Sequence, residues 1–263
     1  MKIRKVLMIS AGVLLAVLAG GVLLGYCVFH GYLWLNNPSE KEYPVWGIDI
    51  SHYQGEVAPE TWEMLAEGEI TAKGHKISFA YIKATEGSGH TDGLFEDNWT
   101  NSGAVCDGSF RVGAYHFFSF DSPGITQLQN FTGQVTAIEG MLPPAVDLEF
   151  YAGNEKNPPD KYQVLEQLRI MLDGLEDAYG SVPVLYATEE SYRYFLEGET
   201  DFTEYPLWIR NVTGKPDIGD RAWDIWQFTN RGLLKDENGN GYFGSSAEAY
   251  VDINVFRGEN LGK

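Results

Sequence analysis

The sequence predicts an α/β protein, namely a modified βα barrel similar to a TIM barrel, preceded by one N-terminal transmembrane helix. Short runs rich in apolar, β-branched and aromatic residues recur along the chain, and segments with helical periodicity separate the earlier runs. Such alternation favours βα units and a mostly parallel sheet. The chain has 263 residues, which suits one such barrel of about 250 residues, and it opens with a long apolar stretch.

The first expected element is a membrane anchor. Lys2, Arg4 and Lys5 precede a run over residues 6–35 that contains no Asp, Glu, Lys or Arg. About 20 apolar residues suffice to cross a bilayer, and basic residues at the start keep the short tail in the cytoplasm. Residues 1–35 are therefore expected to form a cytoplasmic tail and a single-pass signal anchor in the cell membrane, with the following domain outside.

A cleaved signal peptide is the alternative, and it would make the protein secreted. The apolar core of a signal peptide is usually only about 7–15 residues long. Residues 16–20 offer a weak cleavage site, and a lipoprotein would use Cys27, which the bulky Tyr26 precedes. The length of the apolar run favours the uncleaved anchor.

We divide the chain after the anchor into a polar linker at 36–44 and a barrel domain at 45–258. Charge and cysteine content limit the kinds of partner and binding site that this part can have. The formal net charge is −18, with 37 acidic residues against 19 basic ones. Nucleic acid is excluded as a partner because phosphate binding needs a basic surface. Cys106 is the only cysteine outside the anchor, so the domain has neither an internal disulfide nor a cysteine-based zinc site.

Eight strands and at least one long helix follow in order. The helix is expected at residues 160–179, where Tyr162, Leu165, Leu168, Leu172 and Leu175 recur at spacings of three and four. The last strands lie too close together for helices between them, and residues 229–246, rich in Gly and Asn, predict a hairpin-like connection. The expected strands are 45–51, 79–85, 111–118, 144–150, 182–188, 205–212, 224–228 and 249–256.

Two carboxylates stand in the otherwise apolar stretch PPAVDLEF at 143–150. Asp147 and Glu149 are two residues apart, so in a strand they share one face. Neighbouring acids repel, which raises at least one pKa and keeps a carboxyl protonated near neutral pH. A pair of solvated surface acids is the alternative, and the apolar neighbours disfavour it.

Two further acids interrupt other strands. Asp49 lies in GIDIS at 47–51 and Asp252 in YVDIN at 250–254. Active sites of βα barrels lie at the C-terminal ends of the strands, where these acids can meet Asp147 and Glu149. Each of the two could instead cap the turn that follows its strand.

Converging carboxylates suit two chemistries. Glycoside cleavage needs one protonated and one ionised carboxyl beside the scissile bond. A divalent metal site would recruit several oxygens and often imidazole, here from Asp49, His52 and His116, but Asp-x-x-His is a weak pattern. The segment DENGNG at 236–241 resembles the start of a calcium loop, yet Ala247 stands at its twelfth position, which favours a hairpin. We expect no metal and no cofactor.

Aromatic residues crowd the same strand ends. Most must belong to the core, but Tyr and Trp at a barrel mouth also form flat platforms with polar edges on which sugar rings stack. The residues concerned are Tyr53, Tyr81, Tyr115, Phe117, Phe118, Tyr151, Tyr186, Trp208 and Trp226.

Taken in order, these motifs resemble glycoside hydrolase family 25, whose members are lysozymes acting as N-acetylmuramidases on peptidoglycan. The resemblance spans residues 45–256 and implies five βα units plus three closing strands. It also implies hydrolysis of the β-1,4 bond between N-acetylmuramic acid and N-acetylglucosamine. The motifs are GIDISHYQG (47–55), FAYIKATEG (79–87), VGAYHFF (112–118), PAVDLEF (144–150), VLYAT (184–188), PLWIR (206–210), IWQF (225–228) and VDINVF (251–256).

The resemblance also implies roles for individual residues. Glu149 matches the general acid, and Asp147 its partner that stabilises the transition state or orients the substrate's acetamido group. Asp49 and Asp252 match the other two acids of the site. Arg210 stands where members often have Ala, so it is expected to contact substrate or pair with an acid. Together with Arg210, the expected substrate-binding residues are Tyr115, Tyr186, Trp208, Tyr81 and Trp226.

The predicted function is therefore a membrane-anchored muramidase that acts on peptidoglycan glycan strands, in remodelling or local opening of the wall. The alternatives are a catalytically silent glycan-binding or scaffold protein and a metal-dependent glycan hydrolase. Carboxyl spacing separates retaining from inverting enzymes, but an i, i+2 pair can span either range. Participation of the substrate's acetamido group is the preferred hypothesis for the mechanism. The protein could also act with protein partners, as one component of an envelope-spanning machine.

Overall fold

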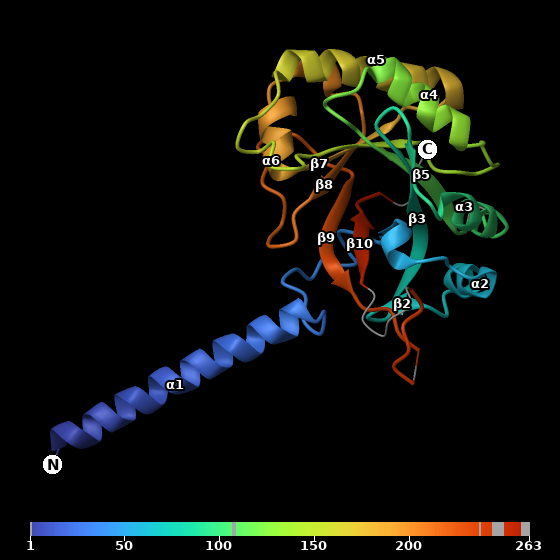
Figure 1. The fold of residues 1–263 in the computed structure, drawn as a ribbon. Coiled ribbons are helices and arrows are strands. Elements are labelled where there is room, and N and C mark those ends of the chain that lie inside the picture. The colour runs from blue at the N-terminus through green and yellow to red at the C-terminus, as the bar shows by residue number, and fades with distance from the viewer. Residues whose placement is uncertain (1, 107–108, 237, 244–249, 259–263) are drawn as a thin grey trace.

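A closed barrel follows one long N-terminal helix (Figure 1). The computed structural model describes residues 2–106, 109–236, 238–243 and 250–258. Its barrel strands pair in the order β1-β10-β9-β8-β7-β6-β5-β3, and β1 pairs with β3 to close the ring. This confirms the predicted fold class. The strands are β1 (Val45–Ile50), β3 (His75–Glu86), β5 (Arg111–Phe117), β6 (Ala145–Leu148), β7 (Val184–Thr188), β8 (Leu207–Arg210), β9 (Ile225–Gly232) and β10 (Val251–Phe256).

One strand runs against the others. All barrel neighbours from β1 through β3 to β9 are parallel, whereas β10 is antiparallel to both β9 and β1. The expectation that all the acids sit at strand C-termini therefore needs correction, because the beginning of β10, not its end, lies at the C-terminal mouth. A parallel pair needs a crossover of a dozen or more residues, whereas an antiparallel strand can follow a hairpin connection.

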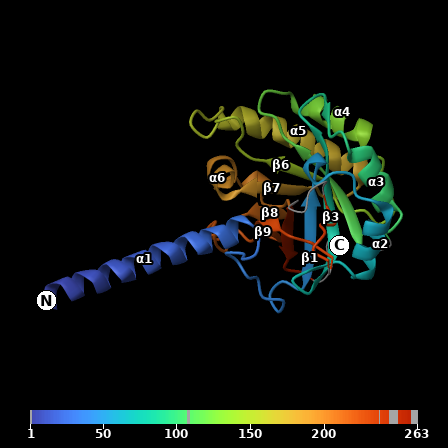
Figure 2. The same ribbon diagram turned by 60° about the horizontal axis from the view of Figure 1, so that its bottom comes forward.

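Helices cover the outside of the first strands. Figures 1 and 2 show α4 and α5 side by side along one flank, and α2 and α3 beside β3. The helices after the first are α2 (Pro59–Glu67), α3 (Phe95–Gly103), α4 (Gly124–Gln134), α5 (Lys161–Tyr179) and the short α6 (Glu189–Ser191), which continues into a π turn at Tyr192–Leu196. Single 3-10 turns lie at His52–Gln54 and Thr200–Phe202, and the short strands β2 (Thr71–Ala72) and β4 (His90–Thr91) pair with β3.

Helix α5 begins and ends where its sequence dictates. The Asp160 side chain accepts a hydrogen bond from the Gln163 amide at 3.0 Å, and Gly180 ends the helix with φ of +67°. The four leucines of the predicted stripe are buried. Tyr162, counted in the same stripe, is instead 73% exposed, because it lies in the first turn beyond the contact with α4 and the barrel.

The barrel interior changes character along its axis. Apolar side chains such as Phe79 and Ile225 fill the end of the interior away from the mouth. Polar side chains such as Gln227, two residues after Ile225 on β9, point inward nearer the mouth. Gly47 gives room for this filling, since a Cβ there would lie 2.4 Å from the Phe79 ring. The lower interior is thus a packed core, and polar groups gather at the mouth.

The segment predicted as a polar linker is part of the barrel wall. Asn36 donates from Nδ2 to the carbonyl oxygens of Phe228 at 2.8 Å and Asn211 at 3.2 Å. Trp34 donates to the Arg231 carbonyl at 3.1 Å, and the buried Tyr43 ring packs against Trp226. This packing has a physical reason: among the described residues no helix covers the outside of β9, so its outward side chains need another cover.

The end of helix α1 (Lys2–Phe29) is docked on the same strand. Its 18-residue stretch Gly12–Phe29 has a mean hydropathy of 2.3, and none of it is buried. The Arg231 guanidinium lies 4.8 Å from the ring centres of both Phe29 and Tyr250. Gly31, at φ +70°, is held so close that a Cβ would come within 2.5 Å of the Arg231 carbonyl oxygen. The barrel therefore follows the helix without a free tether.

We predict that Asn36→Ala destabilises the barrel, because the buried Phe228 carbonyl oxygen loses its side-chain donor and the Asn211 carbonyl oxygen loses one of its two. The expected loss is about 1–3 kcal/mol of unfolding free energy, measured as a lower melting temperature of the full chain in detergent. Asn157→Ala, at an exposed position, serves as the control. Equal melting temperatures for the two variants would contradict the assignment of residues 30–44 to the wall.

Candidate active site

The mouth of the barrel brings the four predicted acids together. Asp49 and Asp252 are directly paired across β1 and β10. Asp147 lies near the end of β6, opposite Tyr186 of β7, and Glu149 follows just after the strand. The charges of Asp49 and Glu149 both act on Asp147, so the four groups share one electrostatic environment. Strand register explains this convergence, because inward-facing positions of the closed ring meet at one end.

Asp49 is the most constrained of these acids. Its Oδ2 accepts hydrogen bonds from Asn254 Nδ2 at 2.7 Å and Gln227 Nε2 at 2.9 Å. Burial raises the pKa of Asp49, while these two donors and a hydrogen bond with Asp252 oppose the rise. Burial and the charge of Asp49 raise the pKa of Asp252 well above its usual range. The two amide donors thus favour the ionised form of Asp49, while the charge of Asp49 favours the protonated form of Asp252.

Asp147 and Glu149 form the second pair. Burial raises the pKa of Glu149 and raises that of Asp147 well above its usual range, with the charge of Glu149 adding to the rise at Asp147. Asp147 Oδ1 is buried and has no hydrogen-bond partner among the described residues. A buried carboxylate oxygen without a donor costs free energy, so this atom is poised for a donor from a ligand.

Two cations temper the repulsion. The positive charge of Arg210 on β8 lowers the pKa of all four acids, and that of Lys83 on β3 lowers the pKa of Asp147 and Glu149. Lys83 Nζ also lies 2.7 Å from Glu86 Oε2 and 4.8 Å from the centre of the Phe117 ring. Arg210 thus lies close enough to the four acids for its charge to act on each of them.

Sequence reasoning missed Lys83, Gln227 and Asn254. Each is a polar residue at an inward position of an otherwise apolar strand, two residues from an inward-facing neighbour. The alternation of FAYIKAT, IWQF and VDINVF carried this signal, because side chains i and i+2 of a strand point the same way. The prediction considered only acidic and aromatic residues as site residues and therefore did not include these three.

The predicted sugar-binding aromatics separate into three groups. Tyr115 is partly exposed among the acids, and burial together with the charge of Asp49 raises the pKa of its hydroxyl well above the usual range. Tyr186 and Trp208 pack edge to face in the barrel interior, with ring centres 4.9 Å apart. Tyr81 is fully buried and donates to the Pro143 carbonyl at 3.0 Å.

Trp226 requires a correction, and so does Tyr81. The Trp226 ring faces outward from β9 against Tyr43 and Phe228, and its Nε1 donates to the Asn211 carbonyl at 2.9 Å. Strand alternation places it outside because its neighbour Gln227 faces in. Tyr81 faces inward but lies below the mouth, closed off from solvent. Neither residue can reach a sugar from these positions.

The residues of the metal alternative are not brought together. His116 faces α4, where its ring nitrogens contact Thr85 Oγ1 at 2.7 Å and Gln127 Oε1 at 3.0 Å. Burial lowers its pKa to about 4, so it stays neutral. His52 is turned toward Asp92, whose Oδ2 lies 2.7 Å from its Nδ1. Neither imidazole shares a ligand geometry with Asp49.

The segment that resembles a calcium loop closes on itself. Lys235 and Gly241 form an antiparallel bridge, and Asp236 Oδ1 accepts hydrogen bonds from the amides of Asn238 and Asn240 at 2.9 and 2.8 Å. The hairpin prediction holds for the described part of 236–241. Position 237, and Ala247 further on, lie outside the described residues.

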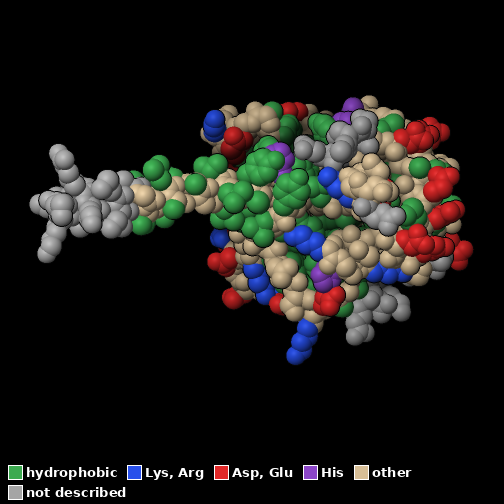
Figure 3. All heavy atoms as spheres, turned by 90° about the horizontal axis from the view of Figure 1, so that it is seen from below, with side chains coloured by type: hydrophobic (Ala, Val, Ile, Leu, Met, Phe, Trp, Pro, Cys, Tyr) green, Lys and Arg blue, Asp and Glu red, His purple; other side chains and the backbone are tan. Residues whose placement is uncertain are grey.

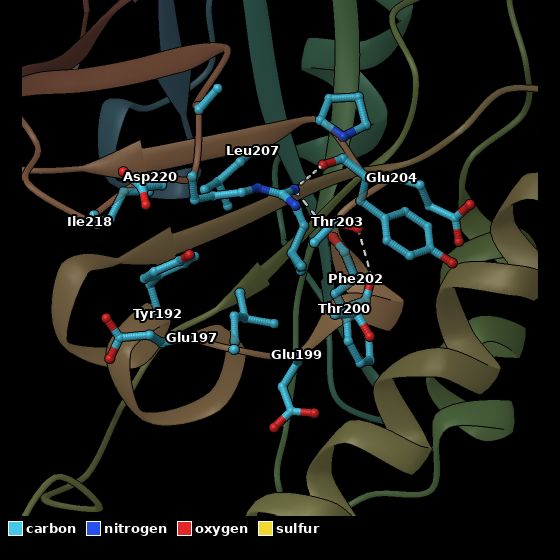
Figure 4. Close-up of a pocket in the computed structure, with 18 of the residues that line it drawn as sticks. Tyr192, Glu197, Glu199, Thr200, Phe202, Thr203, Glu204, Leu207, Ile218 and Asp220 are labelled. Carbon is cyan, nitrogen blue, oxygen red and sulfur yellow. Dashed lines mark hydrogen bonds between the residues drawn. The ribbon is translucent and has the colours of Figure 1, made fainter.

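The cavity drawn in Figure 4 lies away from the acids. It has a volume of about 750 Å³ and surrounds the entry to β8, at the opposite end of the barrel from the mouth. Arg221 is one of its lining residues and donates to the carbonyl oxygens of Phe202 and Tyr205 at 3.2 and 2.7 Å. The guanidinium of Arg221 is already hydrogen-bonded to backbone carbonyls, and none of the four acids lines this cavity. The mouth of the barrel therefore remains the candidate active site.

The family follows from comparison with known proteins. A model of the family described as "Glycosyl hydrolases family 25" matches residues 48–237, which include Asp49, Asp147 and Glu149. The chain belongs to glycosyl hydrolase family 25. This confirms the resemblance seen in the sequence and identifies the chain as a glycoside hydrolase.

Relatives of this family 25 chain extend over most of its length. It is 30% identical over 237 residues to the uncharacterized protein YegX of Escherichia coli (strain K12), covering 89% of this chain and 78% of YegX. Lysozyme M1 of Streptomyces globisporus is 28% identical over 226 residues, covering 81% and 68%. A family 25 glycosyl hydrolase from Bacillus anthracis has a TM-score of 0.71 at 39% identity, covering 85% of this chain and 93% of that one.

The raised pKa of Glu149 predicts a stability effect. Above pH 4, near the pKa of an unfolded Glu, the unfolded chain releases a proton that the folded protein retains, so stability falls as pH rises toward the folded pKa. Glu149→Gln removes this dependence. We expect its melting temperature at pH 7 to exceed that of wild type by about 2–4 °C, with a smaller difference at pH 4.

The matched control for this prediction is Glu166→Gln, at an exposed position on α5. Its melting temperature should follow wild type at both pH values. A Glu149→Gln variant less stable than wild type at pH 7 would show that the ionised carboxylate stabilises the mouth, contrary to the assignment.

Proposed function

We propose that this protein is an N-acetylmuramidase that hydrolyses the β-1,4 bond between N-acetylmuramic acid and N-acetylglucosamine in peptidoglycan. The observation that carries the proposal is the Asp147 and Glu149 pair at the end of β6, with raised pKa values and one buried, unpartnered oxygen. Family 25 membership supports the reaction class. The name of lysozyme M1, given to a relative, supports peptidoglycan as substrate.

Glu149 is the proposed general acid. Its carboxyl lies in the mouth beside the other acids, and burial favours its neutral, protonated form. In the reaction the Glu149 proton moves to the glycosidic oxygen as the bond from that oxygen to the anomeric carbon breaks. Water later adds to the anomeric carbon and returns a proton to the Glu149 carboxylate, which restores the site.

Asp147 is the proposed partner of the substrate's acetamido group. The N–H of that group is a donor of the kind that the buried Asp147 Oδ1 lacks. A hydrogen bond to the ionised form lowers the pKa of Asp147, so binding leaves the shared proton on Glu149. The oriented acetamido oxygen can then attack the anomeric carbon, and displacement by water would give retention of configuration.

Asp49, Asp252, Tyr115 and Arg210 complete the proposed site. Asp49 contributes a fixed negative charge that favours the positively charged transition state. Tyr115 is an aromatic residue of the mouth that remains partly exposed for contact with a sugar ring. Arg210 holds the acids together electrostatically, since its charge acts on each of them.

The helix supports the proposal of a single-pass membrane anchor. Tyr26, Phe29 and Tyr32 are between 53 and 60% exposed where α1 meets the barrel, as expected for aromatic side chains at a membrane interface. Figure 3 shows hydrophobic side chains along the helix and gathered at this junction. Because residues 30–44 are packed on the barrel, the enzyme would act on wall close to its own membrane, in remodelling or local opening.

The proposed reaction is tested on purified peptidoglycan with the full chain in detergent. We expect turbidity loss and new reducing ends at N-acetylmuramic acid, and a loss of about a thousandfold or more in Glu149→Gln. NMR of the first product should show a retained β anomer, whereas an inverted product would exclude acetamido participation. Reducing ends at N-acetylglucosamine, or activity unchanged in Glu149→Gln, would refute the muramidase assignment.

The proposed anchor is tested by fractionation of cells that produce the full chain. We expect the intact chain in the membrane fraction after a carbonate wash, released by detergent, and with the barrel accessible to protease from outside. Residues 30–263 behind a cleavable signal peptide are the matched control and should be soluble. An N-terminus found at or after residue 20 in the mature protein would identify the apolar segment as a cleaved signal.

A further inference from the structure

A continuous line of hydrogen bonds converges on Asp49 from two sides. On one side Trp208 Nε1 donates to Asn254 Oδ1 at 2.8 Å, and Asn254 Nδ2 donates to Asp49 Oδ2 at 2.7 Å. On the other side the Tyr186 hydroxyl donates to Gln227 Oε1 at 3.1 Å, and Gln227 Nε2 donates to the same Asp49 oxygen at 2.9 Å. Asn254 and Gln227 are both buried.

The chemistry of Trp208 fixes the direction of this line. An indole N–H can only donate, so the Asn254 atom that faces it must be the amide oxygen. The Asn254 NH₂ then faces Asp49, whose Oδ2 must accept. With Asp49 as an acceptor, Gln227 must also present its NH₂, and its oxygen is left to accept from the Tyr186 hydroxyl.

Engaged polar atoms and burial disfavour the sugar-contacting role expected for Trp208 and Tyr186 from the sequence. The two side chains are 2 and 7% exposed, and each has its polar atom engaged by a buried amide. Their rings pack on each other, and Trp208 also packs on Tyr81, with ring centres 5.0 Å apart. Both rings are thus held in the barrel interior beside the acids, where Tyr186 pairs with Asp147 across β6 and β7.

We propose that Trp208 and Tyr186 are positioning residues that hold the amides of Asn254 and Gln227 with their donors toward Asp49, and so keep Asp49 ionised during catalysis. The inference rests on the proposed muramidase function and adds a role for two aromatic residues in the barrel interior. If either aromatic donor is lost, the amide behind it is free to rotate and turn its oxygen toward Asp49. Two facing acceptors would then favour a protonated Asp49.

The charge of Asp49 matters to the general acid. That charge raises the pKa of both Glu149 and Asp147, and so helps Glu149 keep its proton. Loss of the Asp49 charge should lower the pKa of Glu149. The other titratable or charged groups that act on these acids are Asp147 of β6, Lys83 of β3, Tyr115 of β5, Tyr186 of β7, Arg210 of β8 and Asp252 of β10.

The test removes single donors and leaves the rings in place. Trp208→Phe and Tyr186→Phe are made in the full chain and assayed in detergent on soluble peptidoglycan glycan fragments. We expect kcat to fall by about 3–30-fold in each variant, with KM within about twofold of wild type. The alkaline limb of the kcat profile, which reports deprotonation of the general acid, should move to lower pH by about half a unit or more.

Matched controls separate this role from general loss of packing. Trp226→Phe removes an indole N–H that bonds the Asn211 carbonyl outside the barrel, and Tyr179→Phe removes a hydroxyl that bonds the Val135 carbonyl. Both controls should keep the wild-type pH profile. Thermal melting identifies any variant that fails to fold, and in that case Tyr186→Phe, which loses one hydroxyl, decides the matter alone.

The outcomes distinguish the inference from the function on which it rests. Inactive wild-type protein would refute the muramidase function itself. Active wild type with unchanged pH limbs in both folded donor variants would overturn the positioning role. A rise in KM at constant kcat would also overturn it, and would return Trp208 and Tyr186 to direct contact with the glycan.

Discussion

Repulsion among four carboxyl groups buried in one barrel mouth is the constraint on which the site depends. The fold opposes it with two neighbouring cations, Arg210 and Lys83, and with amide donors directed at Asp49. Because burial raises the pKa of every acid in the group, protons are retained where the ionised forms would repel most strongly. This environment favours a mixture of protonated and ionised carboxyls, which is the arrangement that glycoside cleavage requires.

A second constraint acts on the outside of the barrel. Strand β9 has an outward apolar face that no helix of the described part of the chain covers, and the segment between α1 and β1 packs on that face. The same residues therefore complete the core and connect the barrel to the apolar helix. Closure of this barrel and its connection to the apolar helix are consequently linked, since Asn36, Trp34 and Gly31 take part in both.

Much of the fold could be predicted from periodicity alone. The spacing of leucines in α5 and the order of apolar runs gave the correct succession of helices and strands, because local burial patterns follow the geometry of each element. The exposed Tyr162, the reversed β10 and the packed segment 30–44 could not be predicted this way. Each depends on which element lies beside it, and a single chain segment does not encode its neighbour.

The sequence by itself determined the family, the barrel and the presence of acids at the strand ends, because these follow from residue type and spacing. Only the tertiary structure decided how the site is held together. It turned Trp226 outward, directed Trp208 and Tyr186 at the buried amides, and brought Asn254 and Gln227 to Asp49. The reason is that hydrogen-bond direction and burial are properties of residues distant in the chain that meet only when the barrel closes.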